Sequence, residues 1–437
     1  MSTPEGAAQP IPTFKIDLAR PPRQRYTEVV ERFGLRMRSL TSLFDDLLAM
    51  FIAASWMRSM LGTLSKLCLR RVYGDEENEE IRGIAEISGV PLYLLVALNS
   101  LLDVLLGCTS GAVPVSQSTK SKSSSSSRGD QGLAEDGQPR LMHFRTLDWG
   151  MDELRDLLVV LEFVDSSSDA PDRVIARSIT YAGFVGMLTA VRKDLSISLN
   201  FRPNHDSHFS KSVRWHQLLV VLGRRKSISS IVRSTILEPL QSHTKAKESP
   251  QENPPKISEK PVSKIHAQAK TLASILSAPC YLILCDGREA AVIEKDYKTG
   301  RIRTSTDFIA QTNHDHQDEK KTSQETDEEP RADRREIITS SFEVEGWIDE
   351  SVDRLECIAK RWRRHTQRAP VKNSAISANS LPVVDAEHRP SITEGTLRRW
   401  VSQYPTMNEV SHFATIMDPT AGEIRWLRRG VVEGGQE

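Results

Sequence analysis

Cysteine thiols are the first residues in this chain that could do covalent chemistry. A thiolate is a strong nucleophile, and the cysteines are Cys68, Cys108, Cys280, Cys285 and Cys357. They are widely spaced, odd in number and without a CxxC pair, which predicts reduced thiols and no structural zinc. Cys108 follows an apolar run that ends at Gly107. On that evidence alone, such a cysteine is most often a small buried core residue.

Other polar residues could accompany a nucleophile, although each also has an ordinary structural explanation. Arg145 and Asp148 stand three residues apart, a spacing that is common in surface ion pairs. Asn313 by itself favours a turn, and Arg334 lies in a charged run that is typical of a solvated surface. The residues 314–316, His-Asp-His, could ligate a metal.

The segments around these residues predict short strands mixed with helices. Residues 14–107 favour helices, with one beginning near 79–84 and another at Pro91. Strand patterns follow at 141–145, 157–163, 174–179 and 196–201.

A helical pair is then predicted over 212–240, and Asp286-Gly287 predicts a hairpin between strands at 281–285 and 290–294. Hairpin-linked strands that alternate with helices indicate an α+β layered architecture and disfavour a doubly wound parallel sheet.

Four polar stretches divide these elements, and we interpret them as solvated insertions: 114–139, 241–262, 315–332 and 366–393. Residues 40–67 are apolar at helical spacing but are interrupted by charges, so they predict an amphipathic helix. That helix either packs on the domain or rests on a membrane surface.

The composition narrows the possible partners. The 437 residues include 58 basic and 58 acidic side chains, so no overall field favours nucleic acid. The first residues show no basic and apolar leader, and no asparagine begins a glycosylation sequon. These features favour the cytoplasm, with a lysosome-like or vacuole-like compartment as the alternative.

Short motifs recur in order along the chain. The central ones are Leu-Gly-Cys-Thr-Ser at 106–110 and His-Phe-Arg-Thr-Leu-Asp-Trp-Gly at 143–150. Further motifs lie at 14–18, 80–83, 181–186, 311–316, 333–335 and 415–417. This ordered series resembles the acid ceramidase and N-acylethanolamine-hydrolysing amidase family.

The resemblance implies a four-layer αββα N-terminal nucleophile hydrolase, which is made as a precursor. The precursor would cut itself between Gly107 and Cys108. Residues 1–107 would then form a helical α chain, and residues 108–437 a catalytic β chain. The resemblance implies neither a cofactor nor a metal.

The same resemblance assigns roles to the candidate residues. Cys108 is the nucleophile, and its freed α-amino group acts as its base. Arg145 and Asp148 flank that terminus, where the guanidinium is expected to lower the thiol pKa. Asn313 offers an N–H to the oxyanion, and Arg334 organises the same wall through charge-assisted hydrogen bonds.

Substrate contacts are expected from Asn200 and Trp149, and apolar residues of the 40–67 helix could receive an acyl chain. The sequence departs from the family where relatives carry Asn-Glu-Arg and this chain has Asn-Phe-Arg at 200–202. Phe201 thus removes a carboxylate near the expected site.

Three functions remain open at this point. The first is a ceramidase-like amidase that releases a fatty acid from a sphingoid base. The second is an amidase for an N-acylethanolamine or another N-acyl amine, since fold and nucleophile do not fix the leaving group. The third is a non-catalytic lipid-binding relative.

Overall fold

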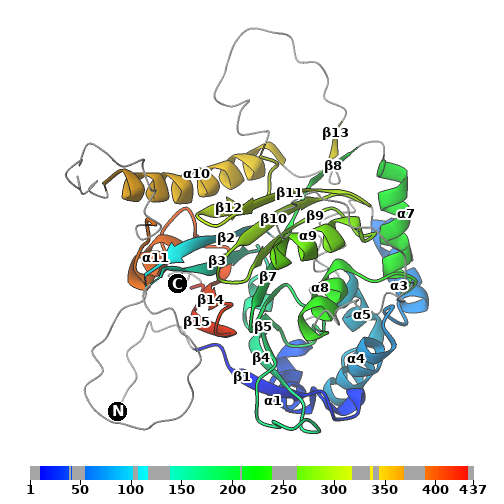
Figure 1. The fold of residues 1–437 in the computed structure, drawn as a ribbon. Coiled ribbons are helices and arrows are strands. Elements are labelled where there is room, and N and C mark those ends of the chain that lie inside the picture. Colours follow the sequence, from blue (N-terminus) through cyan, green and yellow to red (C-terminus); the bar gives the residue numbers. More distant parts are fainter. Residues whose placement is uncertain are drawn as a thin grey trace, which may run out of the picture.

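Two β-sheets lie face to face, with helices on the outer face of each (Figure 1). The computed structural model describes residues 10–38, 41, 55–101, 107–116, 138–206, 209–238, 263–316, 335–337, 344–368 and 389–431.

The larger sheet has eight strands in the order β1, β4, β5, β6, β7, β9, β10, β11. Neighbouring strands run antiparallel, apart from the parallel pair of β1 and β4. The bounds are β1 (Thr13–Asp17), β4 (Leu158–Val164), β5 (Ala176–Tyr181), β6 (Thr189–Arg192), β7 (Leu195–Phe201), β9 (Cys280–Cys285), β10 (Ala290–Lys295) and β11 (Gly300–Ser305).

The smaller sheet has five strands in the order β12, β2, β3, β14, β15. Its bounds are β12 (Ile309–Gln311), β2 (Gly107–Val115), β3 (Arg140–Asp148), β14 (Ser411–Asp418) and β15 (Glu423–Arg429). A separate two-stranded pair joins β8 (Asn204–Asp206) to β13 (Arg335–Ile337). In the β2–β3 pair, Gly107 lies opposite Asp148, and Cys108 lies opposite Leu147.

Helices complete the four layers. The large sheet is covered by α1 (Thr27–Met37), α4 (Asp75–Ser88), α5 (Leu92–Leu101), α8 (Ile228–Leu237) and α9 (Lys264–Ser274), which share one buried cluster with it. The small sheet is covered by α10 (Val344–Arg368) and α11 (Glu394–Val401). At the periphery lie η1 (Pro22–Gln24), α3 (Ser55–Cys68), α6 (Asp152–Arg155) and α7 (Ser210–Val221).

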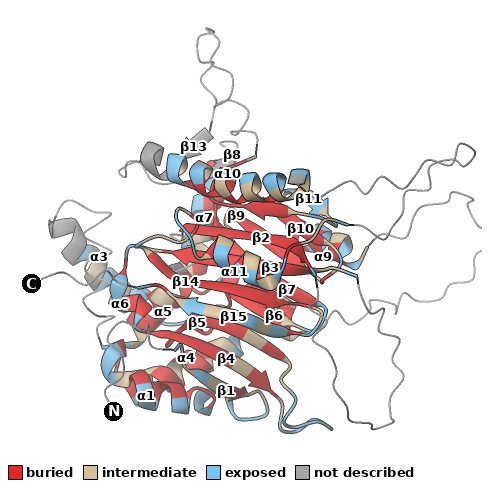
Figure 2. Ribbon diagram, turned by 90° about the vertical axis from the view of Figure 1, so that its left-hand side faces the viewer, coloured by how far each residue is buried: buried red, intermediate tan, exposed pale blue. Residues whose placement is uncertain are grey.

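Burial follows the same layering, since the central strands of both sheets are almost entirely buried, whereas most residues of the edge strands β1, β11 and β15 are partly buried or exposed (Figure 2). A cluster between the sheets includes Ala112, Leu141 and Ile283. A second cluster, which includes Ile358 and Leu397, lies between the small sheet and its two helices. Apolar residues thus fill each interface, and the expected αββα sandwich is confirmed.

The predicted strands and helices of the core are present, and the hairpin turn contains Gly287 at φ +94°. The N-terminal block differs from its expected helical character, because residues 13–17 form β1 at the edge of the large sheet. The predicted insertions fall mostly outside the described residues, as does 42–54 of the expected 40–67 helix.

A buried ion network explains part of the motif at 80–83. The carboxylate of Glu80 accepts hydrogen bonds from both Arg233 on α8 and Arg25. Gly83 is needed on the same helix, because a Cβ there would lie 2.0 Å from the carbonyl oxygen of Arg23. The motif therefore fastens α4 to segments on either side of Cys108 in the sequence.

Glu80→Gln is expected to destabilise the protein by about 3–5 kcal/mol, because it leaves buried guanidinium groups without their counter-charge. Glu79→Gln is the matched control on the same helix, since Glu79 pairs with a half-exposed Arg23 and its loss costs about 1 kcal/mol or less. Urea unfolding of both variants checks this. Equal losses would show that the Glu80 network contributes no more than a surface pair.

Candidate active site

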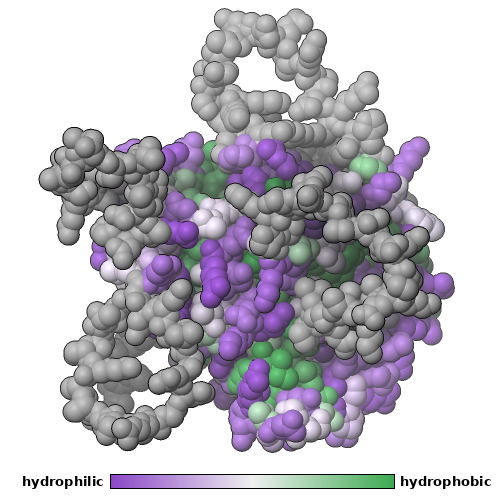
Figure 3. All heavy atoms as spheres, viewed as in Figure 1, coloured by the Kyte–Doolittle hydropathy of each residue, from purple (hydrophilic) through white to green (hydrophobic). Residues whose placement is uncertain are grey.

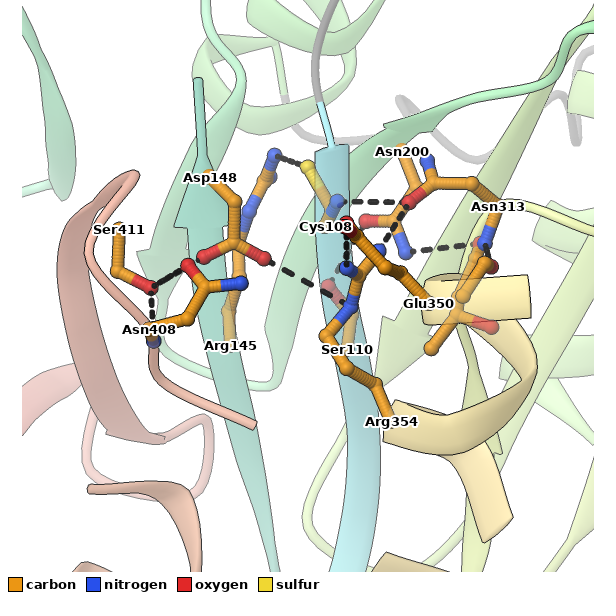
Figure 4. Close-up of polar contacts among 12 residues, drawn as sticks. Cys108, Ser110, Arg145, Asp148, Asn200, Asn313, Glu350, Arg354, Asn408 and Ser411 are labelled. Atoms are coloured by element: carbon orange, nitrogen blue, oxygen red, sulfur yellow. Dashed lines mark hydrogen bonds and ion pairs between the residues drawn. The ribbon is translucent and has the colours of Figure 1, made fainter. Parts of the chain in front are cut away.

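Cys108 is the second residue of β2, and its side chain is fully buried. The backbone N–H of Cys108 donates to Asn313 Oδ1 at 2.8 Å, and the Arg145 guanidinium donates to its Sγ at 3.0 Å (Figure 4). Both reactive atoms of this residue, the nitrogen and the sulfur, are therefore oriented by neighbouring side chains.

Arg145 is held from several directions. Its guanidinium, which is fully buried, donates to the carbonyl oxygens of Leu188 and Leu199, the latter at 2.6 Å. Ser110 is the cross-strand partner of Arg145, so the side chains of Arg145, Ser110 and Cys108 share the inner face of the small sheet. The guanidinium thus lies between the sheets, with its charge directed at the sulfur.

Burial raises the pKa of the Cys108 thiol, and the nearby charge of Asp148 adds to that effect. Arg145 acts in the opposite direction, as the sequence analysis expected, but it does not outweigh burial. The net direction is therefore the reverse of the expected one. The thiol of the uncut chain is protonated at neutral pH and needs a base before it can attack.

Asp148 lies beside the peptide bond that precedes Cys108. A Cβ added at Gly107 would lie 3.4 Å from the Asp148 Cβ. Asp148 Oδ1 accepts from the Ser411 hydroxyl at 2.5 Å, and Oδ2 lies 3.8 Å from Arg354 Nε. Burial raises the pKa of this carboxyl, opposed by Arg354 and by the Ser411 hydrogen bond.

Asn313 faces Cys108 with its oxygen. Its Oδ1 accepts from the Cys108 N–H and, at 3.3 Å, from Arg354 Nη2, while its Nδ2 donates to the Phe201 carbonyl at 2.8 Å. In this orientation of the amide, the oxygen faces two donors and the nitrogen faces a carbonyl acceptor, so all three hydrogen bonds are satisfied. In the uncut chain Asn313 positions the nitrogen of Cys108. Its expected role as an oxyanion donor stays a prediction.

The arginine at this wall is Arg354 on α10. It is buried, with its guanidinium between Asn313 Oδ1 and Asp148 Oδ2. Arg334, which the sequence analysis assigned here from a short Asp-Arg-Arg match, lies outside the described residues. Arg354 was missed, although a signal existed. It lies at helical spacing from the apolar residues Leu355 and Ile358, on a face where a charge is rarely buried unless it is paired.

Asn200 reaches the site, but its polar atoms are used within the protein. Its Oδ1 accepts from the Ser110 hydroxyl at 2.8 Å, and its Nδ2 donates to the Gln311 carbonyl at 3.1 Å. This geometry ties β7 to β2 and β12. Phe201, the next residue, contributes its carbonyl oxygen to Asn313, and its own side chain is buried.

Trp149 follows the end of β3, and its main chain is fixed on both sides. Its N–H donates to the Val410 carbonyl at 2.8 Å, and its carbonyl lies 2.9 Å from His412 Nε2. The indole is partly exposed and packs against the core. Its expected contact with substrate stays a prediction.

The His-Asp-His run at 314–316 is engaged in other contacts. His314 Nδ1 lies 2.9 Å from the Ser351 hydroxyl, and Asp315 accepts two hydrogen bonds from Arg202, each at 2.8 Å. Within the described part of the chain, no group of three or more His, Cys, Asp or Glu side chains could hold a metal ion.

Comparisons with known proteins give a consistent set of relatives. A family model of the beta subunit of N-acylethanolamine-hydrolyzing acid amidase matches residues 9–73. Acid ceramidase of Heterocephalus glaber is 24% identical over 331 residues, 70% of each chain. Acid ceramidase of Rattus norvegicus is 25% identical over 255 residues, 54% of this chain and 56% of that protein.

An uncharacterized protein of Acanthamoeba polyphaga mimivirus is 26% identical over 309 residues, 69% of this chain and 78% of that protein. Among solved structures, a Caenorhabditis elegans N-acylethanolamine-hydrolyzing acid amidase ortholog has a TM-score of 0.41 and 14% identity over 71% of this chain and 93% of that one.

Acid ceramidases of several mammals match this chain over more than half of its length. The chain is similar in sequence to acid ceramidases and, over residues 9–73, to the beta subunit of N-acylethanolamine-hydrolyzing acid amidase. The sandwich is the fold that the sequence resemblance implied, that of an N-terminal nucleophile hydrolase.

Arg354→Gln is expected to lower kcat/KM for amide hydrolysis, the activity proposed below, by about a hundredfold, because it removes the guanidinium that lies between Asp148 and Asn313 beside Cys108. Arg334→Gln is the paired control and is expected to leave kcat/KM near that of the unmodified enzyme. If Arg334→Gln alone abolished activity, the assignment of Arg354 would be wrong.

Proposed function

We propose that this protein is a ceramidase-like lipid amidase, which cuts itself between Gly107 and Cys108 and then hydrolyses the amide bond of an N-acyl sphingoid base. The observation that carries the proposal is the double hold on Cys108. Asn313 positions its nitrogen, and Arg145 positions its sulfur. Both atoms are needed when a cysteine becomes the first residue of its own chain.

The proposed cut is an N-to-S acyl shift. The Cys108 sulfur attacks the carbonyl carbon of Gly107, the Gly107–Cys108 C–N bond breaks, and the thiol proton goes to the departing nitrogen. Water then hydrolyses the thioester, leaving a carboxylate on Gly107 and a free amine on Cys108. Asp148, next to Gly107, is placed to receive and return the proton during the shift.

Hydrolysis of a lipid amide repeats the same chemistry on an external acyl carbon. The freed α-amino group, with a reference pKa of about 7.7–8.0, takes the thiol proton and delivers it to the leaving amine. The acyl group remains on Cys108 as a thioester until water releases it as a fatty acid. The Arg145 guanidinium beside the sulfur stabilises the thiolate and so opposes part of the effect of burial on the thiol pKa.

The proposed leaving amine, a sphingoid base, is inferred from the relatives found by sequence comparison. Acid ceramidases from several mammals match over a longer span than the amidase family model, which covers residues 9–73 only. That model nonetheless favours N-acylethanolamines as the second candidate substrate. Phe201, where family members carry an acidic residue, is the feature of this chain that most favours a non-catalytic lipid binder.

A membrane surface is the expected source of such a substrate. Apolar side chains are exposed on two peripheral helices, Leu64 (48%) and Leu67 (59%) on α3 and Trp215 (57%) on α7. Both helices pack on α5, and Gly223 after α7 lies against the backbone of Arg71 after α3. We call this surface the α3/α7 patch. No helix within the described residues is long and apolar enough to cross a membrane.

Cys108→Ala is expected to leave a single uncut chain of 49.0 kDa and to abolish amide hydrolysis, because it removes the nucleophile of both reactions. Cys285→Ala removes another buried thiol and should still be cut before Cys108 and hydrolyse the substrate. Intact mass and fatty-acid release are the measurements. An uncut but fully active Cys108→Ala protein contradicts the mechanism.

The same assay, run with ceramide and with an N-acylethanolamine of equal acyl length, separates the two substrates. We expect a higher kcat/KM for ceramide. A preference for the N-acylethanolamine would select the second candidate, and a cut chain without hydrolysis of either would select lipid binding.

Replacing Leu64 and Trp215 together by Asp is expected to weaken binding to phosphatidylcholine–phosphatidylserine vesicles more than about tenfold, since each apolar side chain contributes about 1.5–3 kcal/mol when buried. Leu35→Asp is the control, because Leu35 is 80% exposed on α1, outside the α3/α7 patch. Cosedimentation provides the measurement. If Leu35→Asp weakened binding equally, the loss would reflect general charge and not this patch.

A further inference from the structure

Three residues form a row across the end of the small sheet. In the strand registers, Gly107 on β2 is opposite Asp148 on β3, and Asp148 is opposite Ser411 on β14. The β3–β14 register shifts between Ser411 and Phe413, an irregularity of the kind that re-aims a side chain at a strand end. Ser411 is therefore the neighbour of Asp148 on the side away from the Gly107–Cys108 bond.

The Ser411 hydroxyl is itself fixed. It accepts from the Asn408 N–H at 2.9 Å and lies 2.5 Å from Asp148 Oδ1 and 3.2 Å from Asn408 Oδ1. A hydroxyl has one proton to donate. The carboxylate of Asp148 is both closer and a stronger acceptor than the amide oxygen of Asn408. The backbone N–H of Asn408 donates a hydrogen bond to a lone pair of the Ser411 oxygen. We therefore assign the hydroxyl proton to the contact with Asp148, which Figure 4 draws as a dashed line.

We propose that Ser411 is a positioning residue of this active site, whose hydroxyl donates to Asp148 and holds this carboxylate oriented beside the bond between Gly107 and Cys108. The inference deepens the proposed function, because it concerns the same site. No motif used to recognise the family includes Ser411 or Asn408.

The charges around Asp148 explain why such a donor is needed. The charged and titratable groups around it are Arg145 from its own strand, Cys108 from β2, Tyr181 from β5, and Arg354 and Glu350 from α10. Asp148 Oδ2 is buried without a hydrogen-bond donor, and its nearest cation is Arg354 at 3.8 Å. Burial raises the pKa of Asp148, and the Ser411 hydrogen bond is one of the few contacts that lower it.

Ser411→Ala gives the first test, in a Cys108→Ala background so that every chain is uncut. A hydrogen bond to the ionised carboxylate stabilises the fold only above the pKa of Asp148, and this contribution is lost as the pH falls through that value. We therefore expect the drop in urea midpoint caused by Ser411→Ala to be larger at neutral pH than at about pH 4.

Ser88→Ala is the matched control. The Ser88 hydroxyl is also buried and accepts from a backbone N–H, that of Val90, but it donates to the carbonyl oxygen of Ile84. The drop in urea midpoint caused by Ser88→Ala should not vary with pH. An equal pH dependence in both variants, or in neither, overturns the inference, whether or not the protein proves to be an amidase.

The second test follows the cut itself, in chains that keep Cys108. Ser411→Ala should move the acid limb of the pH profile of the cleavage rate up by about one pH unit, since a hydrogen bond to a charged group corresponds to about that shift. Ser411→Thr keeps the hydroxyl and should restore the original profile. A slower cut with an unmoved acid limb would show that Ser411 is merely structural.

Discussion

The constraint on which this site depends is the burial of opposite charges around one sulfur. Arg145, Asp148 and Arg354 are all removed from water, and each comes with its own set of fixed partners. Inside a protein such charges are tolerated only when they are paired and hydrogen-bonded. Their partners come from the residue before β6, from β7, from the segment after β12, and from α10 and β14. Satisfying the charges therefore fixes the ends of these elements relative to Cys108.

Part of this arrangement could be predicted from the sequence. Apolar alternation and the Asp286-Gly287 turn predicted the strands, and the ordered motifs brought Cys108, Arg145, Asp148 and Asn313 together before any geometry was known. The motifs identified these residues because each motif lies within one helix or strand or at its end. Arg354 could not be found in this way, since it lies on α10, beyond the polar stretch that follows Asn313 and outside every short motif, while the role of Arg334 stays a prediction.

The electrostatic state of the thiol lies beyond sequence reasoning for a different reason. A neighbouring guanidinium lowers a thiol pKa and burial raises it, and both conditions hold at Cys108. Spacing along the chain indicates the charged neighbour but not the depth of burial. Likewise, the orientation of the Asn313 amide follows from its surroundings, a carbonyl on one side and two donors on the other.

The edge position of β1 has a consequence for how the two proposed pieces are made. Strand β1 pairs with β4, and Glu80 pairs with Arg233, so contacts between the segments before and after residue 107 form while one chain joins them. Tethered segments meet at a high effective concentration, which separate molecules lack. The interface of the mature protein would thus be inherited from intramolecular folding. Pieces 1–107 and 108–437 synthesised apart would have to find the same parallel register by diffusion, with β4 meanwhile exposed as an unpaired edge.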